Sequence, residues 1–260
     1  MCDSLEDLPL VGYEGHYTSL QITRCFNLKT IKTNSFPGIS AEYINIIQVP
    51  ELVEIQDGFM QGSEDSVKQI YVQSCPKLTS EMFPWNYTAK FTNMNEFHMQ
   101  FMDIETVPGF IQWSPSVQTI RLQHCEKINL IEPFAFSTAT NLTFLELYTT
   151  GNGMVVKPNG FHTMSNNQKQ LLHLWSYSGS PTKLQANAFG NENGGELWDL
   201  IAMPTIEFPE NVFRSMMKTA AEQNALCKYL SGIQMSFITK RSVIIPLINH
   251  WNLVPSLYDA

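Results

Sequence analysis

Few residues in this chain have the types and spacing that catalysis requires. The sequence contains no G-x-S-x-G, H-E-x-x-H or C-x-x-C motif and no glycine-rich phosphate loop. It therefore offers no activated nucleophile, zinc-binding helix or phosphate cradle. Its six histidines are scattered. The two that repeat at equivalent positions, His98 and His173, should lie about 14 Å apart by strand spacing, too far to share a metal. We predict a protein that is not an enzyme and that has no metal or cofactor.

The clearest chemistry in the sequence is that of non-covalent binding. Apolar, aromatic and charged side chains gather between residues 121 and 201, and aromatic anchors ringed by polar groups are typical of protein-binding hot spots. We predict a partner-binding surface here. Its residues are Arg121, Phe144, Glu146, Tyr148, Leu171, His173, Trp175, Asp199 and Ile201, with Leu197 beside them. The alternative is that the C-terminal tail covers this patch, or that the patch is core at a poorly capped end.

A repeat must position these residues. Within residues 117–136, Ile120 and Leu122 alternate like a short strand with one buried face. The pattern recurs at intervals of 23 to 27 residues and predicts a solenoid whose stacked coils share one core. The predicted strand starts are Leu20, Ile44, Ile70, Phe97, Ile120, Leu145, Leu172 and Trp198. The predicted phenylalanine spine is Phe36, Phe59, Phe83, Phe110, Phe136, Phe161, Phe189 and Phe213.

The consensus I-x-I-x-x-C/V-x-x-L-x-x-I-x-x-x-x-F resembles extracellular-type leucine-rich repeat proteins over residues 18 to 215. Among these it is similar to secreted arthropod proteins labelled oplophorus-luciferin 2-monooxygenase non-catalytic subunit. The resemblance implies an α/β-type, right-handed solenoid of about eight coils. A parallel β-sheet would line the concave side, where partners dock, and the convex side would be irregular. Residues 1–17 would be the remnant of an N-terminal cap, and residues 216–260 a non-repeat tail or cap.

Three cysteines occupy one column of the repeat. Cys25, Cys75 and Cys125 each come five residues after a predicted strand start, in coils one, three and five. Alternate coils lie about 10 Å apart at the usual strand spacing, beyond the roughly 7 Å between Cα atoms that a disulfide allows. We predict three buried thiols that are not disulfide-bonded. Repeats of this kind usually carry asparagines in this column, which hydrogen-bond the backbone of the turn. This chain lacks them, so the sequence does not show how the backbone of the turn is hydrogen-bonded.

Composition narrows the class of partner. The net charge is −8, and the 16 lysines and arginines form no cluster, so the chain lacks the basic face that binds nucleic acid. A transmembrane helix needs about 18 consecutive apolar residues, and no apolar run in this sequence approaches that length. Two sequons make Asn86 and Asn141 candidate glycosylation sites. The sequence does not indicate an oligomeric state.

The two ends of the chain leave alternatives open. Residues 1–17 are acidic and lack the apolar region of a signal peptide, which fits either a truncated gene product or residence in the cytosol. Residues 216–260 lack the repeat and contain two prolines in an apolar stretch. They would be either a hydrophobic lid over the last coil or an aberrant terminus.

We consider three functions. The first is a non-enzymatic, extracellular or secreted protein-interaction scaffold, as the resemblance implies. The second is an intracellular substrate-binding repeat of the ubiquitin-ligase adaptor type, which should be preceded by an F-box of about 40 residues and should carry regular convex helices. The third, an accessory subunit of an oxidative enzyme, rests on the resemblance alone. The phenylalanine spine favours the first.

Overall fold

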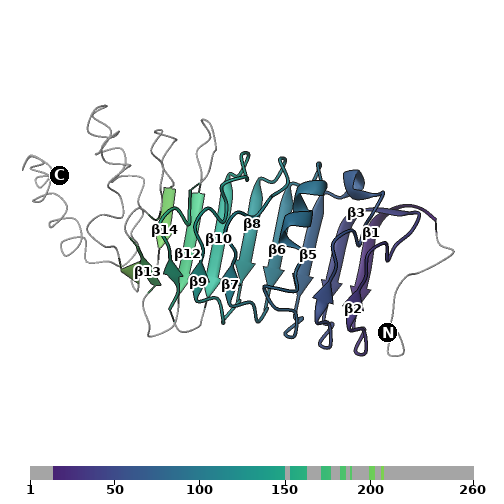
Figure 1. Ribbon diagram of the computed structural model, residues 1–260, viewed down its shortest axis with the longest axis horizontal. Helices are drawn as coiled ribbons and strands as arrows, with labels where there is room; N and C mark the ends of the chain where they lie inside the picture. The colour runs from purple at the N-terminus through teal and green to yellow at the C-terminus, as the bar shows by residue number, and fades with distance from the viewer. Residues whose placement is uncertain are drawn as a thin grey trace, which may run out of the picture.

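The chain forms a parallel β-solenoid, in which strands of successive repeats lie side by side (Figure 1). The computed structural model describes residues 14–149, 153–162, 171–176, 182–185, 188, 199–202 and 206–207. Eight parallel strands form the larger sheet, and we number the coils by these strands. In spatial order they are β1 (Gly15–Thr23), β3 (Ile39–Ile47), β5 (Gln69–Gln73), β6 (Glu96–Gln100), β8 (Thr119–Gln123), β10 (Phe144–Thr149), β12 (Leu171–Ser176) and β14 (Asp199–Ala202).

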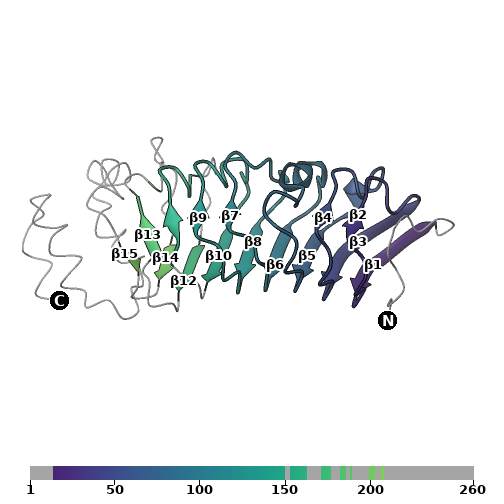
Figure 2. The same cartoon turned by 60° about the horizontal axis from the view of Figure 1, so that its bottom comes forward.

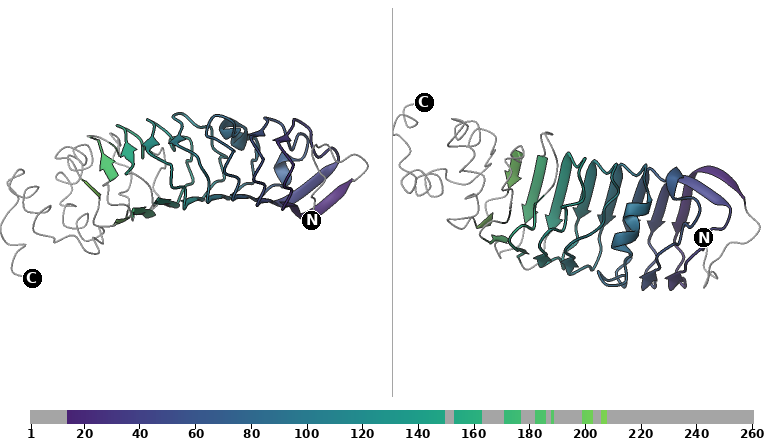
Figure 3. Two further views of the ribbon diagram at one scale, coloured as in Figure 1. Left: turned by 90° about the horizontal axis from the view of Figure 1, so that it is seen from below. Right: turned by 45° about the horizontal axis from the view of Figure 1, so that its top comes forward.

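Short strands form a second layer across the solenoid (Figure 2). The solenoid curves, and the larger sheet lies on the inner side of the curve (Figure 3). We call it the concave sheet. The convex side carries a two-stranded and a five-stranded sheet. Their strands are β2 (Thr30–Ile31) and β4 (Glu54–Ile55), and then β7 (Thr106–Val107), β9 (Leu130–Ile131), β11 (Val155–Val156), β13 (Thr182–Leu184) and β15 (Ile206–Glu207).

The register of the concave sheet follows the alternation of buried and outward residues. Each predicted strand start pairs with the next from Leu20 as far as Leu172, which confirms the first seven starts. The eighth is wrong. Leu172 pairs with Leu200 and not with Trp198, so the last strand lies two residues later than predicted. Side chains alternate strictly across a strand, and a shift of two residues keeps the same face inward.

The convex side contains less helix than the predicted class implies. Two short 3-10 helices, η1 (Glu64–Ser66) and η2 (Trp85–Lys90), are the helical segments of the described residues. The α/β part of the prediction is therefore wrong, and the fold is a β-solenoid. The physical reason is that core residues are closely spaced on this side. Trp85, Tyr87 and Thr88 are all buried within η2, whereas an α-helix would bury residues three or four apart on one stripe.

Most of the described phenylalanine spine is confirmed. Phe36, Phe59, Phe83, Phe136 and Phe161 are buried in one continuous core. Phe110 is a wrong prediction, because its side chain is 64% exposed. Ile111 and Trp113 are buried in that coil instead, and the Trp113 indole Nε1 donates to the Ala135 carbonyl at 2.8 Å. Phe189 and Phe213 lie outside the described residues.

The exposure of Phe110 comes from its backbone conformation. Phe110 has a φ of 56° and Phe134 a φ of 60°. Each lies three residues after the second residue of a short convex strand, in a column shared by Asn34, Gly58 and Asn159, which also have positive φ. Glycine adopts this left-handed region freely and asparagine does so more readily than most residues. A phenylalanine there carries a strain of about 1–3 kcal/mol.

The turn that ends each concave strand also uses left-handed residues. Arg24, Gln48, Ser74, Phe101 and His124 have φ values of 51° to 56°. The first four each donate a backbone N–H to a carbonyl of the next coil at 2.9–3.0 Å. These bonds extend the ladder of the sheet by one residue. They answer the question that the missing asparagine column raised, because main-chain groups bond one another there.

The cysteine prediction is confirmed. Cys25, Cys75 and Cys125 are buried and form no disulfide. Loss of solvation raises the pKa of the Cys75 thiol to about 11 and that of the Cys125 thiol to about 12. Each Sγ lies 3.4–3.7 Å from the carbonyl oxygen two residues earlier. In this column the thiols fill space in the shared core as small apolar groups.

Candidate functional site

The concave sheet brings most of the predicted binding residues together. Strand β10 supplies Phe144, Glu146 and Tyr148. Arg121 of β8 pairs with Glu146, and Glu146 pairs with His173 of β12. Because the strands are parallel and in register, these side chains form rows that run across the sheet. The predicted surface is therefore continuous from coil five to coil seven.

The shifted register of β14 changes the last part of this surface. Asp199 pairs with Leu171, and Ile201 pairs with His173. The sequence prediction had placed Asp199 beside His173 and Ile201 beside Trp175, and both placements are wrong by one step of the alternation. Leu197 lies outside the described residues. Strand β14 thus places Asp199 and Ile201 two residues away from their predicted pairing positions.

Arg121 is the centre of a polar network. Its Nη1 donates to Glu96 Oε1 at 2.6 Å, and its Nε lies 3.6 Å from Glu146 Oε2. The guanidinium carbon also lies 5.3 Å from the centroid of the Phe144 ring. Three strands hold this guanidinium, so little side-chain freedom remains to be lost when a partner binds. The sequence prediction missed Glu96, the first residue of β6.

Gln123 joins this network to a histidine. Its Nε2 donates to Glu146 Oε2 at 2.7 Å, and a hydrogen bond of 2.9 Å joins its Oε1 to Nε2 of His98. The His98 ring also lies 4.7 Å from the ring of Tyr71. Burial lowers the pKa of His98, although the bond to Gln123 opposes the shift. The neutral ring is therefore favoured near neutral pH.

Aromatic rings follow the edge of the sheet where the strands end. The Tyr148 ring lies 4.1 Å from the His124 ring, which stacks on Phe101 at 4.7 Å with an interplanar angle of 18°. Phe101 is 46% exposed. The sequence prediction included Tyr148 and missed the other two, because they lie in the left-handed turn after the strand, beyond its alternation. We call Phe101, His124 and Tyr148 the edge aromatic row.

A second aromatic contact lies on the sheet itself. The Phe144 and His173 rings meet edge to face, with centroids 4.9 Å apart. Burial lowers the pKa of His173, and the charge of Glu146 opposes this shift. The structure thus combines rings with a preorganised guanidinium and two carboxylates. Such groups bind a partner non-covalently. Among the described residues, no group of three histidine, cysteine, aspartate or glutamate side chains is arranged to hold a metal.

The two sequon asparagines, Asn86 and Asn141, are exposed. Asn86 is the second residue of η2, and its Oδ1 accepts the backbone N–H of Gln112 at 2.9 Å. Asn141 lies three residues before β10, and its Nδ2 donates to the Pro115 carbonyl at 2.7 Å. Each residue is exposed, and each side chain also bonds the backbone of a neighbouring coil.

Comparisons with known proteins assign no family to this chain. No family model matches it, and no curated protein matches it. Within the described residues, no helix is long and apolar enough to cross a membrane. The function must therefore be inferred from the concave sheet and the contacts that its residues make.

Proposed function

We propose that the chain is an extracellular-type leucine-rich repeat protein, similar to the secreted arthropod proteins named above, that acts as a non-enzymatic protein-interaction scaffold. In this proposal the solenoid is right-handed, has about eight coils, and binds a protein partner on the concave face of coils six to eight. The observation that carries the proposal is the cluster of rings around Tyr148 and Phe144 on the concave sheet. It is the kind of surface on which a few anchors supply most of the affinity.

The polar network supports this choice of surface. Arg121 is fixed between Glu96 and Glu146 before any partner arrives, so binding loses little conformational entropy there. Aromatic rings add large contact area for few rotatable bonds. The charged groups would act chiefly on orientation and association rate, because partly exposed charges contribute less to affinity than buried rings.

The alternatives receive less support. Adaptor-type repeats should carry regular helices on the convex side, and the described residues form only two 3-10 helices. An accessory role beside an oxidative enzyme has no particular residue in its favour. Secretion is supported by the exposure of both sequon asparagines, Asn86 and Asn141, which would carry glycans in an extracellular protein.

The experiment compares binding with stability. A partner captured by the immobilised full-length chain is titrated against Tyr148→Ala, Phe144→Ala and the control Gln21→Ala in the first coil. We expect the first two to weaken binding by about 2 kcal/mol or more, as anchor residues do, and the control to change little. The same variants are followed by thermal unfolding.

The competing explanation makes the opposite prediction. If the tail, residues 216–260, covers this face, truncating Trp175 or Tyr148 should lower the melting temperature and leave affinity unchanged. If the partner binds Tyr148→Ala and Phe144→Ala as tightly as the original chain, the concave surface is not the binding site. Glycan mapping on protein secreted from eukaryotic cells tests the extracellular assignment separately.

A further inference from the structure

A pocket opens on the convex side of coils two to four, across the solenoid from the concave surface. Its volume is about 420 Å³. It lies where the ladder of short strands is interrupted: β4 pairs only with β2, β7 begins the next sheet, and the described residues of coil three form no short strand. Single hydrogen bonds bridge the gap, from Ile55 N–H to the Met82 carbonyl and from Thr106 N–H to Ser80 Oγ, each 3.1 Å.

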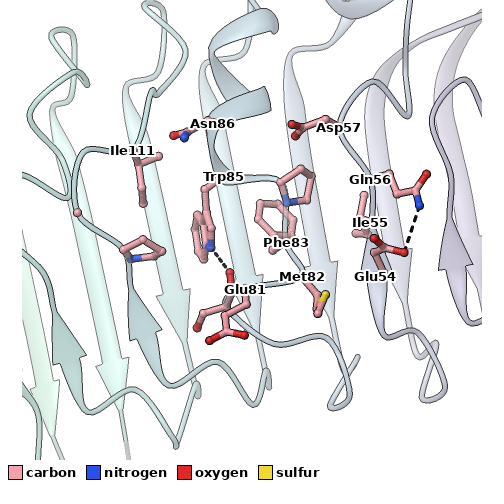
Figure 4. A pocket seen from close by; sticks show the side chains of 14 residues that line it. Glu54, Ile55, Gln56, Asp57, Glu81, Met82, Phe83, Trp85, Asn86 and Ile111 are labelled. Atoms are coloured by element: carbon pink, nitrogen blue, oxygen red, sulfur yellow. Dashed lines mark hydrogen bonds between the residues drawn. The ribbon is translucent and has the colours of Figure 1, made fainter.

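The floor of the pocket is aromatic. Figure 4 shows Phe83 and Trp85 side by side at its middle, with ring centroids 4.9 Å apart. The Trp85 indole Nε1 donates to the Ser80 carbonyl at 2.7 Å, which fixes the ring. Met82 stands beside them with 46% of its side chain exposed. Phe83 and Trp85 are each only 6% exposed, so an apolar chain lying in the pocket would contact mainly the flexible thioether, with the two fixed rings beneath it.

The rim of the pocket is acidic. Glu54, Asp57 and Glu81 line it, and among the described residues no lysine, arginine or histidine does. Elsewhere in the described part of the chain, carboxylates pair with lysines of the following coil, as Glu51 does with Lys77 at 2.6 Å. None of the ion pairs among described residues includes a rim carboxylate. The pocket therefore complements a positively charged ligand.

The cation that fits must be carried on an apolar stem. Among the described residues, no group of three possible ligand side chains is arranged to hold a metal ion. A lysine or arginine side chain combines an alkyl stem, which can lie along Met82 and Phe83, with a charged end that reaches the rim. The shape and the charge of the pocket thus indicate one kind of ligand.

An exposed aromatic surface continues from the pocket. Gly109 and Ile111 line the pocket. Phe110 lies between them in the chain, and its ring packs at a tilt against the Phe134 ring, with centroids 5.1 Å apart. These are the two phenylalanines that replace asparagine or glycine in the left-handed convex column. They give a neighbouring apolar side chain of the same ligand a surface on which to pack.

We propose that this convex pocket binds a lysine or arginine side chain in an extended segment of a partner protein, with a flanking apolar residue of that segment packed on Phe110 and Phe134. The site is separate from the concave surface and does not depend on it. A scaffold with two such faces can hold two partners at once.

The test uses short peptides and the unglycosylated full-length chain, because Asn86 also lines the pocket. The probe is acetyl-leucyl-lysyl-leucinamide, and its matched control carries acetyl-lysine, which has the same stem without the charge. Binding is followed by the NMR signals of the Met82 methyl and the Trp85 indole N–H. We expect saturable shifts of both signals with the lysine peptide, and binding about three-fold or more weaker with the neutral one, as expected for a partly exposed ion pair.

Three variants localise the effect. Asp57→Asn combined with Glu81→Gln should weaken binding by about three-fold, close to the effect of neutralising the lysine, because the same exposed ion pairs are lost. Phe110→Asn should also weaken it, and this variant will fold, because Asn34 and Asn159 occupy the same position in other coils. Glu126→Gln, an exposed acid that does not line the pocket, is the control and should bind like the original chain. The proposal is overturned if neither signal shifts saturably, if the acetyl-lysine peptide binds equally well, or if the control weakens binding as much as the double variant.

Discussion

Replacing Phe136 and Phe110 by alanine separates what the repeat pattern predicts from what the structure predicts. The two residues occupy one column of the sequence repeat, so the pattern alone assigns them equal importance. Phe136 has 0% exposure and stacks between Trp113 and Phe161, at 6.2 and 6.3 Å. Phe136→Ala should therefore cost about 3–5 kcal/mol, the usual cost of a cavity left by a buried phenylalanine.

Phe110→Ala removes a ring that is 64% exposed and has Phe134 as an aromatic neighbour at 5.1 Å. Little apolar area returns to water, and the loss is at most about 1 kcal/mol. For a solenoid of this size each kcal/mol shifts the melting temperature by about 2–4 °C. We therefore expect a fall of about 6–20 °C for Phe136→Ala and of less than about 4 °C for Phe110→Ala.

Thermal unfolding followed by circular dichroism measures both shifts, and urea unfolding gives the free energies independently. Solenoids can lose coils at one end before the rest, so the tryptophan signal should be compared with the backbone signal to show that both report one transition. Equal destabilisation by the two substitutions would refute the assignment of Phe110 to the surface, and with it the left-handed convex column.

Two further predictions follow from the buried titratable groups. Cys75 and Cys125 should resist alkylation at pH 8 and react fully after denaturation, because their thiol pKa values are raised to about 11 and about 12. Mass spectrometry before and after unfolding measures the labelling, and rapid labelling of the folded chain would contradict the prediction. For His98, whose pKa is lowered by burial in the folded chain, the unfolded state binds the proton more tightly. Stability should therefore fall as the pH drops below the ordinary histidine pKa of about 6.5 and be unaffected above it. His98→Gln should flatten this dependence in urea titrations at pH 5 and pH 8, and an unchanged slope would show that another group is responsible.

The sequence was sufficient to predict the strand register of seven coils because the alternation has a strong physical cause. Ile44 and Ile46 must both face the core while Asn45 faces outward, and a register shifted by one residue would bury an amide. The eighth coil lacked such a constraint. Trp198 and Leu200 fit the alternation as well as Leu200 and Ala202 do. The pattern alone therefore could not decide whether Leu172 pairs with Trp198, as predicted, or with Leu200, as observed.

Other features depended on backbone conformation, which spacing does not reveal. Phe110 falls at the correct interval for the spine, yet a positive φ turns its side chain outward. Phe101 and His124 were missed because they also have positive φ and lie one residue after the strand, where the alternation has ended. The column offered one signal that could have been used: Asn34, Gly58 and Asn159 are the residue types that tolerate left-handed backbone, and they align with Phe110 and Phe134.

The two surfaces should respond differently to salt because their charges are in different states before binding. On the concave sheet Arg121 is already paired with Glu96 and Glu146, so a partner meets a cation whose charge is already balanced and gains mainly from ring burial. At the convex pocket Glu54, Asp57 and Glu81 have no cationic residue beside them in the lining, so a ligand cation forms new, partly exposed ion pairs. At an ionic strength of about 0.15 M charges are screened over about 8 Å. Raising the salt to about 0.5 M should therefore weaken the lysine peptide several-fold and leave the affinity of a concave partner almost unchanged. Equal salt sensitivity at both surfaces would mean that the Arg121 network opens when the partner binds.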